Sequence, residues 1–132
     1  MNDDEKNEVS KGKQLEILLR TLSTYGAKHI AKALSSNTFV RRVRLDGFKL
    51  KDEGAILIAD SLKVNRVLTD ISMCSNFIGD TGADAIGEAI ALNQTLKILK
   101  LWDNLFGDMG VKSISRGLQA NLSLRYSIHP FI

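Results

Sequence analysis

Hydrophobic and polar positions recur along this chain with a period of 28 residues. Asparagines keep that interval at Asn37, Asn65, Asn93 and Asn121. Glycines keep it at Gly26, Gly54, Gly82 and Gly110. Between these markers run apolar columns, such as Val40, Leu68, Leu96 and Leu124, or Ile30, Ile58, Ile86 and Ile114. Because about ten columns share one period, the chain is predicted to be a repeat protein.

The residue pattern of each repeat predicts one short strand followed by one helix. Leu99 and Leu101 stand two residues apart, which is the pattern of a short strand with one buried face. Val111, Ile114 and Leu118 then stand three and four residues apart, as on a helix with one apolar stripe. Units of this kind are expected to stack into a curved α/β solenoid.

Polar residues recur at the two ends of each predicted helix. Aspartates stand just ahead of the helices, at Asp52, Asp80 and Asp108. A carboxylate there accepts the free N–H groups of the first turn and meets the positive end of the helix dipole. The asparagine column follows the helices, and asparagine tolerates the left-handed conformation that ends them. We therefore expect aspartate N-caps and left-handed asparagine C-caps.

One stretch of the chain carries the repeat pattern in full. It reads Leu96-x-x-Leu99-x-Leu101-x-x-Asn104-x-Phe106-Gly107-Asp108-x-Gly110, and ends in Leu118-x-x-Asn121. This closely resembles the leucine-rich repeat of the ribonuclease-inhibitor type, and the resemblance covers about residues 15–126. Relatives by this resemblance include ribonuclease inhibitor, NOD-like receptors, the Ran GTPase-activating protein and tropomodulin-like actin regulators.

The resemblance implies a right-handed superhelix with a parallel sheet on its concave face and helices on its convex face. It also implies that Asn76 and Asn104 are ladder asparagines, whose side chains satisfy the backbone where each strand leaves the sheet. Phe48 and Arg20 depart from the pattern at that position. Their turns must be satisfied in another way.

The two ends of the chain differ from the regular units. Residues 1–14 are rich in charge and are expected to form a flexible N-terminal tail. Residues 15–132 are expected to form a repeat domain of about four units with an irregular C-terminal end. There Ser127 and His129 replace the expected strand leucines. Either Tyr126, Ile128 and Phe131 fold back as a cap, or the chain is a piece of a longer array.

Composition limits the class of protein. The 132 residues are 44% hydrophobic and 25% charged, which fits one soluble globular domain. No stretch approaches the roughly 20 apolar residues of a membrane-spanning helix. The charged N-terminus lacks the apolar core of a secretory signal. The single cysteine, Cys74, favours a reducing setting, so we expect a cytoplasmic protein without membrane insertion.

Residues with catalytic or ligand-binding chemistry are sparse. None of the common nucleotide-binding, zinc-protease or serine-hydrolase motifs occurs. Gly79-Asp80-Thr81-Gly82 resembles a phosphate-binding turn, but its recurrence one repeat later gives it a structural explanation. His29 and His129 have no partners at metal-ligand spacing. We therefore predict no catalytic residues, no cofactor and no metal.

The outward side of the predicted strands is the expected binding surface. Its candidate residues are Arg42, Arg44, Asp70, Ser72, Cys74, Lys100, Trp102, Asp103 and Tyr126. Strands about 4.8 Å apart place Arg44, Ser72 and Lys100 in one row. A second row holds Asp46, Cys74 and Trp102. Because acidic and basic residues balance on this face, and the whole chain carries only +3, nucleic acid is not expected as a partner.

Trp102 is the leading candidate contact, since tryptophan and arginine dominate binding hot spots. It is alternatively an aromatic side chain partly covered by its neighbours. Arg42 and Arg44 beside Asp70 are alternatively a solvated ion cluster. We expect a non-enzymatic interaction scaffold for a protein partner. The second hypothesis is a regulator of an enzyme partner, such as a GTPase-activating module using Arg20.

Overall fold

The computed structural model describes residues 2–7, 11 and 26–128. Residues 3–7 are helical. Helices and strands then alternate in the order α2 (Ala27–Ser36), β1 (Arg42–Arg44), α3 (Lys51–Val64), β2 (Asp70–Ser72), α4 (Asp80–Leu92), β3 (Ile98–Lys100), α5 (Asp108–Ala120) and β4 (Tyr126–Ile128). The expected boundary between a tail and a repeat domain falls outside the described residues and stays a prediction.

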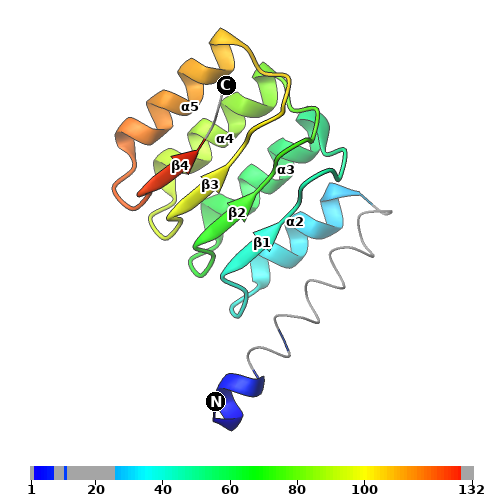
Figure 1. Ribbon diagram of the computed structural model, residues 1–132, viewed down its shortest axis with the longest axis vertical. Coiled ribbons are helices and arrows are strands. Elements are labelled where there is room, and N and C mark those ends of the chain that lie inside the picture. Colours follow the sequence, from blue (N-terminus) through cyan, green and yellow to red (C-terminus); the bar gives the residue numbers. More distant parts are fainter. Residues whose placement is uncertain (1, 8–10, 12–25, 129–132) are drawn as a thin grey trace.

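The strands form one parallel sheet in chain order, β1-β2-β3-β4. Val43 pairs with Ile71, and Ile71 pairs with Leu99, so the sequence period becomes the strand register. The helices pack side by side in chain order along one face of the sheet (Figure 1). Among the described elements none covers the other face, which we call the open sheet face.

The core lies between the sheet and the helices and follows the apolar columns. Its strand side holds Val43, Leu45, Ile71, Met73, Leu99 and Leu101. Its helix side holds Ile30, Leu34, Ile58, Leu62, Ile86 and Ile90. Burying one such side chain fully stabilises the fold by roughly 1.5–3 kcal/mol. The predicted row of stacked apolar residues is confirmed for these units.

The asparagines after the helices do not adopt the left-handed conformation, so that prediction is wrong. Asn65 is extended, with φ −69° and ψ 133°. Its Nδ2 donates to the carbonyl oxygen of Leu34 in the preceding helix at 2.8 Å, and its Oδ1 accepts from the N–H of Leu68 at 2.7 Å. Asn93 and Asn121 repeat both kinds of contact. The extended backbone lets one side chain satisfy a free helix carbonyl and the turn that follows.

The aspartates cap helices, but not their own. Oδ1 of Asp52 accepts from the N–H groups of Gly79 and Gly82, at 2.6 and 3.1 Å, where α4 begins. Asp80 does the same for Gly107 and Gly110 at the start of α5. Because each aspartate lies inside the first turn of its helix, its side chain reaches the neighbouring helix. The prediction that an aspartate accepts N–H groups at a helix start is confirmed for Asp52 and Asp80, but each caps the next helix and not its own, and Asp108 caps none of the described helices.

Small residues bring α4 and α5 into backbone contact. A Cβ added at Gly117 would lie 2.2 Å from the carbonyl oxygen of Gly87. The predicted apolar stripe of α5 is only partly buried, because Val111 is exposed. Val111 is the repeat equivalent of Ala83, whose Cβ lies against Gly110 of the next helix. In α5 that side faces away from α4, so the described residues leave it uncovered.

Candidate functional site

Strand pairing brings the predicted surface residues together in rows. Arg44 pairs with Ser72, and Ser72 pairs with Lys100, as predicted. The row beside it runs from Arg42 through Asp70 and Ile98 to Tyr126. Arg42 Nε lies 3.6 Å from Asp70 Oδ2, with the arginine side chain largely in solvent. Such an exposed pair contributes about 0–1 kcal/mol to stability, which leaves Arg42 available to a partner.

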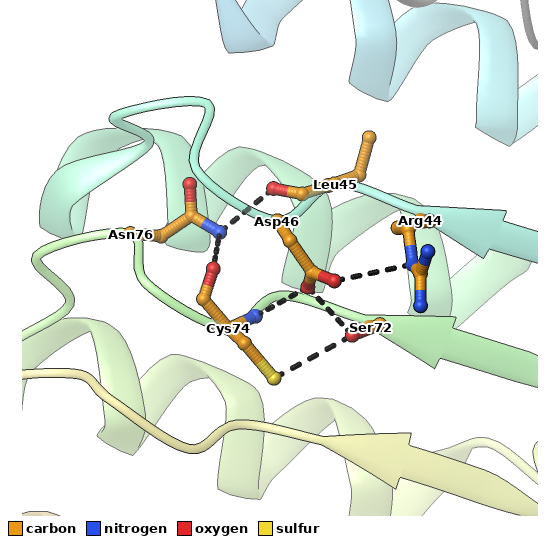
Figure 2. A network of polar contacts seen from close by, with 6 residues as sticks. All are labelled: Arg44, Leu45, Asp46, Ser72, Cys74 and Asn76. Atoms are coloured by element: carbon orange, nitrogen blue, oxygen red, sulfur yellow. Dashed lines mark hydrogen bonds and ion pairs between the residues drawn. The ribbon is translucent and has the colours of Figure 1, made fainter.

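The Asp46 carboxylate organises the end of β1 and β2 (Figure 2). Its Oδ1 accepts from Ser72 Oγ at 2.6 Å and from the Cys74 N–H at 2.8 Å. Its Oδ2 lies 3.3 Å from Nε of the exposed Arg44. Asp46 is therefore a fixed negative charge that holds two neighbouring units together and orients Arg44 across the open sheet face. The sequence placed Asp46 in a row with Cys74, and this contact confirms that juxtaposition.

The Cys74 side chain lies beside that of Ser72, as its register predicted, but neighbouring groups cover it and only 2% of its surface is exposed. Its Sγ lies 3.5 Å from Ser72 Oγ. Burial is the main cause that raises the pKa of the thiol, and the nearby Asp46 carboxylate adds to it. Hydrogen bonds from Ser72 and the backbone near Trp102 oppose that rise. The thiol is thus a small buried group with little surface of its own on this face.

Trp102 is 48% exposed, which fits both a binding residue and an aromatic side chain partly covered by its neighbours. Its backbone is fixed, since its carbonyl accepts from the Ser75 N–H at 3.1 Å. Asp103 follows with φ 56°, and its Oδ2 accepts from Ser75 Oγ at 2.7 Å. A rigid backbone under an exposed indole lowers the entropy lost when a partner covers it.

The ladder asparagines lie under this surface. Asn76 Nδ2 donates to the carbonyls of Leu45 and Cys74, at 2.8 and 3.0 Å. Its Oδ1 accepts from the N–H groups of Phe48 and Leu50. Asn104 makes the matching contacts one unit later. The turn with Phe48 at the ladder position is thus satisfied by the asparagine of the next unit.

Some predicted residues cannot be placed. Arg20 and His129 lie outside the described residues, so the enzyme-regulator hypothesis stays untested. The structure gives the backbone pairing of Tyr126 and nothing of its side chain. His29 lies in α2. Within the described ranges no group of three or more histidine, cysteine or acidic residues could hold a metal ion. None of the helices there is both long and apolar enough to cross a membrane.

Sequence reasoning missed the loops after the strands. Phe77 and Leu105 are exposed in these loops, and Met109 is exposed in the first turn of α5. The repeat register contained a signal, because Phe77 and Leu105 occupy the column that begins with Lys49. A column that contains a lysine as well as large apolar residues does not belong to the core.

A family model described as "Leucine Rich repeat" matches residues 64–87 and 92–115. These two stretches are leucine-rich repeats. Each stretch runs from the end of one helix through a strand into the next helix, which is the unit described above. The matching stretches cover β2 to the first part of α5. Comparison with curated protein sequences finds no match.

Two solved structures are similar to this chain. "Leiomodin-1 Actin-Binding Site 2 (ABS2)" matches with a TM-score of 0.75 and 29% identity, over 80% of this chain and 62% of that one. The tropomodulin C-terminal domain of Caenorhabditis elegans matches with a TM-score of 0.63 and 16% identity, over 71% of this chain and 57% of that one. The chain therefore spans less than two thirds of either structure.

Proposed function

We propose that the chain is a non-enzymatic protein-interaction module, a repeat solenoid of the ribonuclease-inhibitor type that acts in the cytoplasm. Its partner binds the open sheet face through Trp102 and Arg44, with Arg42, Lys100 and Asp103 around them. Asp70, Ser72 and Tyr126 complete the proposed contact surface. The observation that carries the proposal is an exposed tryptophan on a fixed backbone, beside arginines held by neighbouring carboxylates.

The charges of the face favour a protein over a polyanion. Arg42, Arg44 and Lys100 stand with Asp46, Asp70 and Asp103, so the strand ends carry no net positive track. A phosphate backbone needs such a track, whereas a protein partner pairs with mixed charges around an aromatic anchor.

Actin is the first partner to test, because the leiomodin structure that matches this chain is named as an actin-binding site. The test uses co-sedimentation with filamentous actin and fluorescence titration with monomeric actin. If the proposal holds, wild-type protein binds one form saturably. Affinity capture from the source cell, with the bound proteins identified, tests the broader proposal of a protein partner.

Substitutions decide whether the open sheet face is used. The double variant Trp102→Ala, Arg44→Ala should fold normally and lose at least about 30-fold in affinity, as loss of a hot-spot residue typically costs about 2 kcal/mol or more. Leu92→Ala with Arg116→Ala removes an apolar and a basic residue from the helices and is the matched control. Equal binding by both double variants would contradict the proposed face.

A further inference from the structure

The loops that join strands to helices form a second surface beside the open sheet face. They lie in layers, because each loop is hydrogen-bonded to the next. The Gly47 N–H donates to the carbonyl of Cys74 at 3.0 Å, and the Leu105 N–H donates to that of Ile78 at 2.8 Å. What we call the loop ledge is defined by five exposed residues, Lys49, Phe77 and Leu105 of the loops and Lys51 and Met109 of the first helical turns that follow them.

One end of the loop ledge is apolar. Phe77 is 54% exposed, Leu105 67% and Met109 61%, with Trp102 at the border toward the open sheet face. Phe77 and Leu105 occupy the same position in consecutive units, so their loops lie side by side. Large apolar side chains gathered in solvent on a hydrogen-bonded backbone are typical of interaction sites.

Phe77 supports this interpretation in a second way. Its φ is 58°, a left-handed conformation that bulky residues rarely adopt. Its side chain is exposed, so packing in the core does not require phenylalanine there. Glycine or asparagine would fit the backbone better. A bulky residue that occupies an unfavourable backbone conformation while its side chain lies in solvent points to a role in binding.

Charge distinguishes the two ends of the loop ledge. Lys49 lies in the first loop and Lys51 begins α3; both are exposed, and neither ammonium group has a carboxylate partner among the residues that the structure describes. Asp108 lies next to Met109 at the other end, also exposed. The surface is thus positive, then apolar, then negative.

We propose that the loop ledge binds an amphipathic helix of a protein partner. The apolar side chains of that helix cover Phe77, Leu105 and Met109, and an acidic side chain pairs with Lys49 or Lys51. Units about 4.8 Å apart separate Lys49 from Leu105 by roughly 10 Å. Because an α-helix rises 1.5 Å per residue, the acidic residue of the partner helix stands about seven positions from the apolar residue that covers Leu105.

The opposite charges at the two ends fix the direction of that helix. They also disfavour an anionic membrane, because Asp108 would lie against lipid headgroups beside the apolar residues. The proposal needs no contact with the open sheet face. Its success or failure is therefore independent of the function proposed above.

The single tryptophan makes the test direct, since Trp102 borders the loop ledge and reports its environment. Two synthetic helical peptides of about 20 residues, without tryptophan, share one apolar stripe and carry either glutamate or lysine at the seven-residue spacing. The glutamate peptide should change Trp102 emission saturably, at least tenfold more tightly than the lysine peptide. Equal binding of the two peptides would overturn the proposal.

Variants distinguish binding at the loop ledge from non-specific hydrophobic binding. Phe77→Asn should lower the affinity for the glutamate peptide at least tenfold. It should leave the thermal midpoint of the protein unchanged or raise it. Phe39→Asn removes an exposed phenylalanine at the opposite end of the repeat units and should leave binding unchanged. Full binding by Phe77→Asn would overturn the proposal. So would preferential binding to vesicles of anionic lipid, or self-association of the protein that accounts for the change in emission.

Discussion

Asp52 and Gly82 join two consecutive repeats, since the carboxylate of Asp52 accepts the Gly82 N–H at 3.1 Å and so caps the helix of the next unit. Asp52→Ala should therefore weaken α4, although the substituted residue lies in α3. Loss of a side-chain N-cap typically costs about 1 kcal/mol. We expect the free energy of unfolding to fall by about 1–2 kcal/mol in urea denaturation.

Asp108 provides the matched control for that experiment. It is the repeat equivalent of Asp52 and Asp80, but its carboxylate has no hydrogen bond or ion pair with any described residue. Asp108→Ala should change stability by less than about 0.5 kcal/mol, as substitutions at exposed positions usually do. A loss as large as that of Asp52→Ala would contradict capping between units.

Gly117 should not tolerate a side chain. A Cβ there would lie 2.2 Å from the backbone carbonyl of Gly87, so α4 and α5 would have to separate. Gly117→Ala is expected to lower the free energy of unfolding by about 1–3 kcal/mol or more, since a backbone carbonyl cannot move aside as a flexible side chain does. The thermal midpoint measures the loss.

Gly107 is the control for Gly117. Nothing lies within 4 Å of a Cβ added there, and its φ of −104° is open to all residues. Gly107→Ala should change stability by no more than about 1 kcal/mol, because alanine restricts the unfolded chain but is a poorer N-cap than glycine. If both substitutions lowered stability alike, the effect would come from backbone conformation and not from helix packing.

Asn76 should be the most sensitive polar residue of the described units. It is fully buried and donates to two carbonyls while accepting from two N–H groups. Asn76→Leu leaves these backbone groups without hydrogen-bond partners in a buried turn, where each unsatisfied group costs about 1–3 kcal/mol. We expect at least that loss in chemical denaturation. Asn121→Leu, at a half-buried position, should cost less.

The 28-residue period predicted the elements and the strand register well, because each column of like residues repeats one packing environment. Leu99 and Leu101 were correctly placed in the core for this reason. The contacts between units were predicted less well. Sequence gives the distance along the chain from Asp52 to its own helix, but not to the helix that lies beside it, so the capped helix was misassigned.

The candidate surface was predicted in part. Strand alternation placed Arg44 and Trp102 in solvent correctly, because both follow the period of the strand. The expected exposure failed at Cys74, because neighbouring groups bury its thiol although it occupies the same column as Trp102. Strand alternation missed Phe77, since the signal for exposure, the lysine at the equivalent position Lys49, lies outside the apolar columns that define the core.

Cys74 should react slowly in the folded protein and lower its stability at high pH. Burial raises the pKa of the thiol, so above about pH 8.5, the usual value for cysteine, the unfolded chain loses this proton before the folded chain does. The unfolded state then binds fewer protons, and stability falls as pH rises. Below that pH both states are protonated, and Cys74 contributes no pH dependence.

Two measurements test this behaviour of Cys74. Modification by a thiol reagent at pH 8 should be slow in buffer and become fast in denaturant, because only the thiolate reacts and the folded protein buries it. In urea denaturation between pH 7 and 10, Cys74→Ala should lose less stability than the wild-type protein as the pH rises. Rapid modification of the folded protein, or identical pH profiles for the two proteins, would show that the thiol is accessible and its pKa ordinary.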